Sequence, residues 1–328
     1  MRSNLSPNQN AILTPEEQLE QHEPINLWKD ALDRLLANRL AITGLIIVLI
    51  LFLIAIIGPY ITPYDFLSQD LTQRNQSPTV QHWLGTDDLG RDVISRIIYG
   101  ARTATVVAFS VTGISVLIGI LLGALAGYIG GWVDSLILWI IDLTMSIPSL
   151  LLAVVINISL KSPITYWMDD MFLKTQKPIF RETSWVDFAL VFGALALVMW
   201  PTYARLIRGQ IIGIRKENFI LAAQAMGLSR WRILTRYVIP NALGPVIVQA
   251  SAGLGQAMVL ESAFSFLGVG VRPPIPSWGN MIKDGLRVWR SYSFLLAAPA
   301  SVLGIVTVAF SFLGDGLNDA LNPKSWKD

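Results

Sequence analysis

Long apolar runs separated by polar segments divide most of the chain. The first run, residues 40–60, has the ~20 residues that an α-helix needs to cross the ~30 Å hydrocarbon core of a bilayer. Five more runs predict further spans, at residues 103–128, 132–160, 186–207, 242–262 and 294–313. The pattern therefore predicts an all-α membrane protein with six transmembrane helices and both ends of the chain on the same side.

The segments around these spans set the expected organisation of the chain. The first span follows a polar segment too long for a signal-peptide n-region, and no small-residue cleavage site follows it, so we interpret it as uncleaved. Residues 1–27 are polar and acidic, which is typical of a disordered tail. We expect the rest to comprise an amphipathic helix with the first span (28–61), an external segment (62–100), a core (101–315) with an external insertion (161–184), and a short tail (316–328).

The distribution of basic residues only partly decides the orientation. Lys and Arg are nearly balanced between the two sets of connecting segments, so their sum does not distinguish the sides. Their density does, because seven of them crowd the connection after the fourth span: Arg205, Arg208, Arg215, Lys216, Arg230, Arg232 and Arg236. Since cytoplasmic loops carry an excess of positive charge, we expect this connection and both termini to be cytoplasmic.

Composition excludes several classes of function. With 53% hydrophobic and 15% charged residues the chain is too apolar for a soluble domain, and a net charge of +2 does not indicate a nucleic-acid partner. There is no cysteine, and neither His22 nor His82 stands in a metal-binding motif. The dipeptide Gly-Lys of a phosphate-binding loop never occurs, and Gly253 and Gly255 lie in an apolar run without a third glycine. We expect no cofactor, no metal and no catalytic residue.

Acidic residues are rare within the predicted spans. Asp142 lies ~15 Å into the third span by helical rise, so it must face protein or a water-filled path. Pathway lining and a buried helix-to-helix hydrogen bond both stay open for it. One isolated acid is not a catalytic pair, which disfavours a membrane hydrolase. In the second span, Gly119, Gly123 and Gly127 recur every four residues and predict close packing of a neighbouring helix.

The connection after the fourth span predicts two short helices joined by a tight turn. Residues 217–226 form the first helix, Gly227 ends it in a left-handed conformation, and Ser229 caps the second. We expect the second helix to end at Ile239, because Pro240 follows it. Such a rigid unit suits contact with another protein, but an amphipathic helix resting on anionic lipid explains the same pattern.

Four stretches resemble blocks of the permease subunits of binding-protein-dependent ABC importers, in the C-type subunit of the dipeptide, oligopeptide and nickel group. They are LGTDDLGRDVISRIIYGAR (84–102), WPTYARLIRGQ with ENFILAAQAMGLSRWRILTRYVIPN (200–210 and 217–241), SFLGVGVRPPIPSWGNMI (265–282) and FLGDGLNDALNPK (312–324). The likeness runs from about residue 28 to residue 323. Because the blocks occur in order and are separated by the expected spans, the resemblance is specific.

The resemblance implies a type I ABC importer permease fold with a cytoplasmic coupling helix, in a bacterial inner membrane. It implies a heterodimer with a homologous second permease, two ATPase subunits and an extracytoplasmic solute-binding protein. The chain would form half of the translocation pathway and, having no ATPase site, would not be an enzyme. The favoured solute is a di- or oligopeptide, with nickel or another small solute as the alternative. A stand-alone secondary transporter, which would need coupling-ion carboxylates and usually internal repeats, is remote.

The resemblance also assigns roles to single residues. The residues that it assigns to ATPase coupling are Leu221, Ala222, Ala223, Gly227 and Pro240. The two alanines would leave room for a second surface to come close. The motif usually has glutamate where this chain has Leu221, so one charge-assisted contact with the ATPase is missing. Two further positions depart from the motif: Gln224 stands where arginine is common, and Tyr237 stands where histidine is frequent.

Charged residues of the outer segment and the third span are the remaining candidates. Besides Asp142, we expect a pathway or gate role for Asp87, Asp88, Arg91 and Asp92, although turn and cap chemistry explains this stretch equally well. The insertion at 161–184 is longer than the family pattern. Its aromatic residues predict an ordered external cap that either contacts the binding protein or has no partner.

Overall fold

The computed structural model describes residues 27–181 and 184–321, so nearly all of the predicted tail at 1–27 lies outside the described residues. Over these two ranges the chain is helical and has no strand. Its helices are α2 (Leu27–Ala37), α3 (Arg39–Ile61), η1 (Leu71–Gln73), α4 (Val93–Ile129), α5 (Gly131–Ser146), α6 (Ser149–Thr175), α7 (Pro178–Arg181), α8 (Ser184–Ile214), α9 (Asn218–Ala225), α10 (Arg230–Ile233), the π-helical turn η2 (Leu234–Val238), α11 (Ile239–Phe266), α12 (Trp278–Val288) and α13 (Phe294–Leu321).

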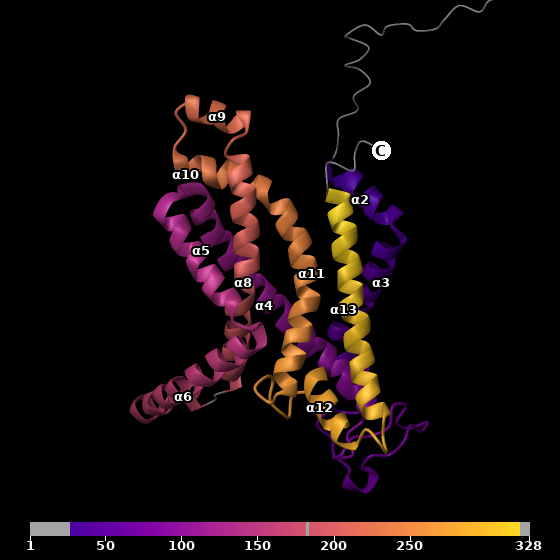
Figure 1. Ribbon diagram of the computed structural model, residues 1–328. Coiled ribbons are helices and arrows are strands. Elements are labelled where there is room, and N and C mark those ends of the chain that lie inside the picture. The colour runs from indigo at the N-terminus through magenta and orange to yellow at the C-terminus, as the bar shows by residue number, and fades with distance from the viewer. Residues whose placement is uncertain (1–26, 182–183, 322–328) are drawn as a thin grey trace, which may run out of the picture.

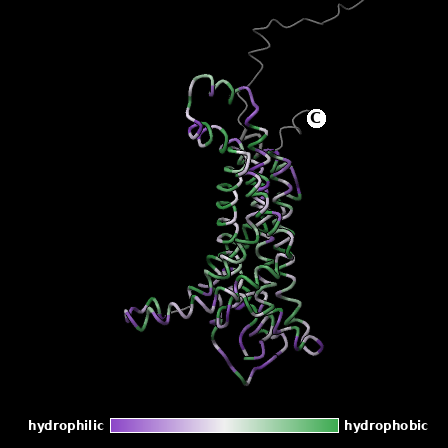
Figure 2. Tube along the Cα trace, turned by 60° about the vertical axis from the view of Figure 1, so that its left-hand side comes forward, coloured by the Kyte–Doolittle hydropathy of each residue, from purple (hydrophilic) through white to green (hydrophobic). Residues whose placement is uncertain are grey.

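The predicted number of spans is confirmed by length and composition. In the described chain, six helices are long and apolar enough to cross a membrane: Arg39–Ile61, Val93–Ile129, Ser149–Thr175, Trp185–Ile214, Arg230–Phe266 and Phe294–Leu321. Figure 2 shows apolar residues along the length of the bundle and hydrophilic ones toward its ends and the tip of α6. The helical class of the fold is therefore as expected.

The third span differs from the prediction of one helix over 132–160. Two helices occupy this stretch, α5 and α6, and the chain between them is extended at Ile147 (φ −99°, ψ 136°). The cause is Pro148, which disfavours helical geometry in the residue before it and has no N–H to continue the ladder. The chain therefore changes direction within the span.

The molecule has two distinct ends. Figure 1 places α9, α10, α2 and the C-terminal end of α13 at one end, called the α9 end below. The opposite end, called the α12 end, holds α12 and the connecting segment between α3 and α4. From the α12 side α6 runs outward as an arm. Both described ends of the chain, at α2 and α13, lie at the α9 end, in agreement with an even number of spans.

The glycines of α4 confirm the predicted packing device. A Cβ atom built on Gly123 would lie 2.4 Å from the Ala204 carbonyl oxygen, and one on Gly119 would lie 2.5 Å from the Tyr203 Cβ. Both neighbours belong to α8, so α4 and α8 approach backbone to backbone along this stripe. This is the main helix-to-helix contact of the fold.

The insertion at 161–184 is ordered where it is described, but it is not a separate cap. Instead α6 continues past residue 161 to Thr175, and α7 folds back on it, so that the Trp167 and Phe180 rings pack edge to face 5.8 Å apart. The base of the arm is fixed by Lys161, whose Nζ lies 2.5 Å from the Asp187 Oδ1 of α8. Contact with a binding protein stays a prediction.

Candidate functional site

The short helix α9 and the turn after it form as the sequence predicts. Glu217 is the extended residue before α9, and Gly227 takes a left-handed conformation (φ +76°). In that turn the Gly227 N–H donates to the Gln224 carbonyl (2.9 Å), and the Leu228 N–H donates to that of Ala223 (3.2 Å). The Ser229 hydroxyl oxygen then accepts from the Arg232 N–H (3.4 Å) at the start of α10. The turn therefore satisfies carbonyls at the end of α9.

The break expected at Pro240 does not occur. The chain stays helical from Arg230 to Phe266, through a π-helical turn over Leu234–Val238, and Pro240 lies in the first turn of α11. Proline is tolerated there because its missing N–H is offset by the changed register of the wider turn. The segment after the Ser229 cap is thus a direct extension of the span α11.

One face of α9 is buried against the span helices. Ile220 and Ala223 pack in a cluster with Ile211 of α8 and with Ile233 and Val238 before α11. The expectation that Ala223 leaves room for another protein is therefore wrong, because its Cβ is already covered by this chain. The packing fixes α9 to two spans at once.

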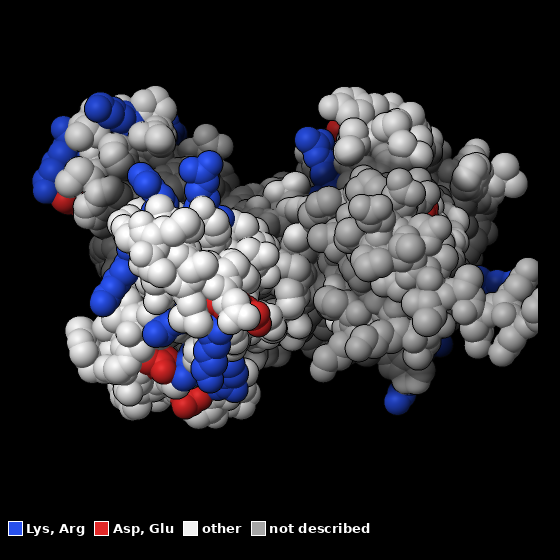
Figure 3. Space-filling model, turned by 90° about the horizontal axis from the view of Figure 1, so that it is seen from above, with Lys and Arg blue, Asp and Glu red and all other residues white. Residues whose placement is uncertain are grey.

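The opposite face of α9 is apolar and open. Phe219, Leu221 and Met226 are 45%, 51% and 73% exposed, and Ala222 is exposed between them. We call these four residues the α9 patch. Leu221 adds apolar surface at the position where the motif that this segment resembles usually has glutamate. Figure 3 looks down on this end and shows Lys and Arg side chains gathered around the part of the surface that lies over α9 and α10 in Figure 1.

Arg215, which directly follows α8, links the end of that helix to the end of α4. Its guanidinium donates to the carbonyls of Gly127 and Tyr128 at the end of α4, both at 2.9 Å, and lies 5.7 Å from the centre of the Tyr128 ring. The ends of α4 and α8 are therefore held together directly below α9.

Two of the basic residues assigned to the connection lie within α8 instead. Arg208 makes two hydrogen bonds to the Asp134 carboxylate (2.5 and 2.7 Å), and Arg205 makes one to Asp142 (2.6 Å). Both acids belong to α5, so two ion pairs join α5 to α8. Sequence reasoning missed these partners because it assigned both arginines to the connection after the fourth span and considered no partner for them. The Asp142 side chain is 68% exposed in this chain, so its contact with Arg205 does not bury it.

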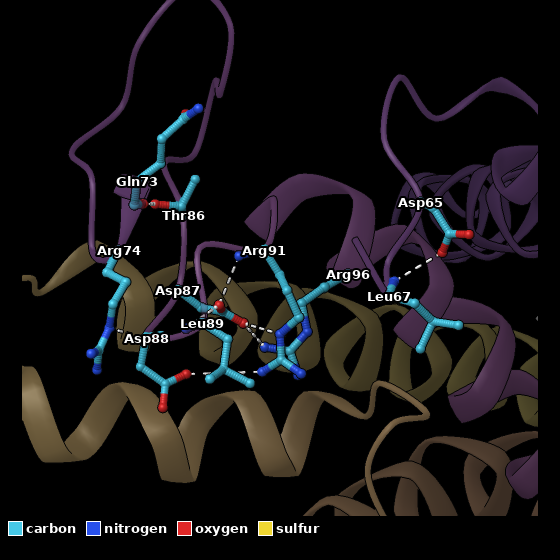
Figure 4. A network of polar contacts seen from close by, with 10 residues as sticks. All are labelled: Asp65, Leu67, Gln73, Arg74, Thr86, Asp87, Asp88, Leu89, Arg91 and Arg96. Carbon is cyan, nitrogen blue, oxygen red and sulfur yellow. Dashed lines mark hydrogen bonds and ion pairs between the residues drawn. The ribbon is translucent and has the colours of Figure 1, made fainter. Parts of the chain in front are cut away.

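The outer segment before α4 is held by a buried charge network (Figure 4). The Asp87 carboxylate accepts from the Arg91 guanidinium at 2.7 Å and also from Arg96, a residue that the sequence did not single out. Asp92 caps α4 by accepting from the Ser95 N–H (2.8 Å) and contacts His82 (2.9 Å). Asp87, Arg91 and Asp92 are buried, so their contacts match turn and cap chemistry. Their role in a gate stays a prediction.

Asp88 is the more open member of this group. Its carboxylate lies 3.9 Å from Arg91 and its side chain is 44% exposed. Together with Arg96 and Asp284 of α12 it lines a cavity of about 20 Å³ between the outer segment and α12. Burial, and then the nearby Asp88 charge, raise the pKa of Asp284 above its ordinary value. The outer segment and α12 therefore face each other across this cavity.

Comparison with known proteins agrees with these features. A family model described as "binding-protein-dependent transport system inner membrane component" matches residues 119–327, and one described as "N-terminal TM domain of oligopeptide transport permease C" matches residues 26–78. The chain belongs to this family of transport permeases. It is a multi-pass membrane protein of the ABC permease type, as the resemblance implied.

Curated relatives span nearly the whole chain. The dipeptide transport system permease protein DppC of Alkalihalophilus pseudofirmus is 37% identical over 318 residues, which is 95% of this chain and 96% of that protein. The oligopeptide transport system permease proteins OppC of Bacillus subtilis and Escherichia coli are each 33% identical, covering 92% and 91% of this chain and 90% and 92% of their own.

Proposed function

We propose that this chain forms half of the translocation pathway of an ATP-driven peptide importer, and that separate ATPase subunits drive it through α9. The observation that supports this proposal most directly is that the two faces of α9 differ. One face is packed against the spans, and the other presents the α9 patch within a basic surround. A membrane-surface helix would need only the open face, whereas a lever must also be fixed to the parts that it moves.

The packing of α9 supports such a lever. A force on the α9 patch passes through Ile220 and Ala223 to α8 and to the helix that continues into α11. Because close-packed contacts transmit displacement, tilting α9 should tilt both spans together. The ion pairs between α8 and α5, and the Arg215 contacts with α4, extend the moving unit. Leu221, Ala222 and Gly227 then act at the docking surface, whereas Ala223 and Pro240 act inside the lever.

The peptide solute is supported by the names of relatives that align along most of this chain, which are dipeptide and oligopeptide permeases. The favoured orientation has the α9 end in the cytoplasm, so α2 and the C-terminal end of α13 are cytoplasmic too. The α12 end then faces the solute-binding protein. A homologous second permease completes a heterodimer, and two ATPases dock, one on each permease. Residues 101–315 remain the proposed transport core, with α3 as an added span.

Substitution of Ala222 tests the docking surface. Ala222→Trp places a large side chain in the α9 patch without touching the core, so the permease should fold normally. Association with the co-expressed ATPase subunits should weaken about tenfold or more, because a bulky group in a close contact typically costs ~1–3 kcal/mol. The measurement is the amount of ATPase that co-purifies with the tagged permease, together with peptide uptake by cells.

The matched control is Ala37→Trp. Ala37 is an exposed helical alanine of α2 at the same end of the molecule, on the side away from α9. The Ala37→Trp permease should retain both ATPase association and peptide uptake. Normal association in Ala222→Trp, with uptake at the level of the control, would refute the assignment of α9 as the docking element.

A further inference from the structure

A large cavity lies beneath α9, where α10 comes close to the turn between α4 and α5 (Figure 1). Its volume is about 740 Å³. The α9 patch does not line it, so the cavity is separate from the proposed docking surface. The residues of the lining that matter below are Leu125, Tyr128 and Ile129 of α4, Arg215 after α8, and Arg230 and Trp231 of α10.

The polar part of the cavity is cationic. Arg215 and Arg230 both line it, and no acidic residue of the described chain does. Arg215 uses only its Nη1 to donate to the Gly127 and Tyr128 carbonyls, so its other N–H groups have no partner within the described residues. The exposed Arg230 side chain makes no hydrogen bond or ion pair in that part of the chain. Two guanidinium groups with free donors at one cavity suit the oxygens of a phosphate group.

The apolar part of the cavity leads into the exposed surface of α4. Leu117, Leu121 and Leu125 follow one another at four-residue spacing on one side of this helix and are 60%, 57% and 38% exposed. We call these three residues the α4 stripe. It reaches the cavity at Leu125, and α4 carries no charged residue from Thr103 to its end at Ile129. An apolar surface on a candidate span therefore ends at the two arginines.

Aromatic side chains surround the same cavity. Tyr128 and Trp231 line it, and Trp132 lies at the start of α5, directly after the turn that ends α4. The two tryptophans are 69% (Trp231) and 76% (Trp132) exposed. Tyrosine and tryptophan are enriched where a span passes from hydrocarbon to lipid headgroups, because each has an apolar ring and a polar N–H or O–H group. The cavity therefore carries the residue types that this boundary favours.

We propose that this cavity binds an anionic phospholipid. The lipid phosphate contacts Arg215 and Arg230, and one acyl chain lies along the α4 stripe. Charge complementarity supports an anionic headgroup. The α4 stripe supports a lipid rather than a soluble phosphate, which has no apolar part to cover it. The inference concerns lipid binding alone and does not depend on the proposed function.

The charges of the cavity also distinguish between classes of lipid. Phosphatidylcholine and phosphatidylglycerol both carry a phosphate, but phosphatidylcholine adds a quaternary ammonium close to it. That cation would stand beside the Arg215 and Arg230 guanidinium groups, and like charges repel each other. Phosphatidylglycerol brings the negative charge without a cation. The site should therefore prefer phosphatidylglycerol.

Photocrosslinking in nanodiscs tests the site. The full-length chain, in the transporter with which it assembles, is placed in phosphatidylcholine that contains a small fraction of phosphatidylglycerol with a diazirine in one acyl chain. After irradiation, mass spectrometry identifies the crosslinked peptides. We expect label on residues 117–129, which unlabelled phosphatidylglycerol competes away. The same probe with a phosphatidylcholine headgroup should label these residues at least about fivefold less. Equal labelling by both probes, or no label on residues 117–129, would overturn the proposal.

A single substitution tests the role of the cavity charge. Arg230→Gln removes one of the two cations from the lining, so labelling by the phosphatidylglycerol probe should fall at least about fivefold. The matched control is Arg232→Gln. Arg232 is an exposed arginine of the same short helix, but it does not line the cavity. The control should keep the labelling of the parent. An equal loss in both variants would show a general effect of surface charge and refute the site.

Two further arms of the experiment identify other occupants. Millimolar inorganic phosphate, compared with chloride at equal ionic strength, should leave the labelling unchanged. If phosphate abolishes it, the cavity takes a free phosphate and the lipid assignment is wrong. The labelling is also repeated after the ATPase subunits are removed. Label that appears only then would show that an ATPase, and not a lipid, fills the cavity. Because the readout is a crosslink and not transport, failure of this proposal leaves the proposed function standing.

Discussion

Two adjacent alanines of α9 have opposite surroundings, although nothing in their type distinguishes them. Ala222 is exposed in the α9 patch, and Ala223 is buried against Ile220 and the spans. The motif therefore combines a docking position with a packing position. Sequence alone placed both at the docking surface, because the helical phase of an eight-residue helix depends on how its neighbours pack.

Ala223→Trp should destabilise the permease itself. An indole in this closely packed site must displace Ile220 or its neighbours, which costs ~1–3 kcal/mol or more. The thermal midpoint of the detergent-solubilised permease, measured without its ATPases, should fall, whereas that of Ala222→Trp should match the parent. Equal thermal midpoints for the two variants would show that both alanines face outward.

Asp87 and Asp88 are adjacent, but their substitution by Asn should have very different effects on stability. Asp87→Asn leaves the buried guanidinium groups of Arg91 and Arg96 without their shared carboxylate, and breaking a buried pair typically costs ~3–5 kcal/mol. Asp88→Asn removes only a long contact at a half-exposed side chain, worth at most ~1 kcal/mol. Thermal unfolding of the purified permease measures the difference. A gate role without a structural one would instead alter transport in Asp87→Asn and leave its stability intact.

At the scale of the elements, proline had opposite effects at two positions. Pro148 separates α5 from α6, as local stereochemistry dictates, whereas Pro240 lies inside a continuous helix. The difference is the π-helical turn over Leu234–Val238, which changes the register of the hydrogen bonds before Pro240. Nothing in the local sequence signals that turn.

The glycine stripe of α4 gives a sharp test at this scale. Gly123→Ala would place a methyl group 2.4 Å from the Ala204 carbonyl oxygen, so α4 and α8 must separate, at a cost of ~1–3 kcal/mol. Gly113 lies on the same helix with nothing within 4 Å of a built Cβ. Gly113→Ala should be neutral, or stabilise by up to ~1 kcal/mol through helix propensity.

Thermal unfolding and the yield of monodisperse protein compare the two variants. We expect a lower midpoint and more aggregation for Gly123→Ala alone. If both alanine variants behave like the parent, the two helices do not pack at the distance that the structure gives.

For the whole molecule, the apolar pattern predicted the six spans and the family blocks predicted the permease class, because both depend on local composition. The sequence did not reveal that Arg205 pairs with Asp142, since these residues meet only when α5 and α8 pack. Nor did it reveal that Arg96 joins Asp87, because that contact depends on how the segment before α4 folds back on the helix. It also assigned residues 161–184 to a connection, where the structure extends α6 as an arm. The apolar pattern therefore predicts the architecture, whereas the partners of the charged residues depend on the tertiary fold.

The orientation of the whole molecule can be tested directly because the chain contains no cysteine. Single cysteines at Val80 and Met226 would report on the two ends, since these side chains are 93% and 73% exposed and lie at the α12 end and the α9 end. With the α9 end in the cytoplasm, a membrane-impermeant maleimide should label Val80→Cys in intact spheroplasts and Met226→Cys only after permeabilisation. Ala37→Cys, at the α9 end but outside the α9 patch, should behave like Met226→Cys even where a bound ATPase covers that patch. Labelling of Ala37→Cys in intact spheroplasts, with Val80→Cys protected, would place α9 outside the cell. In that position no cytoplasmic ATPase could reach it, and the lever mechanism would fail whatever the solute.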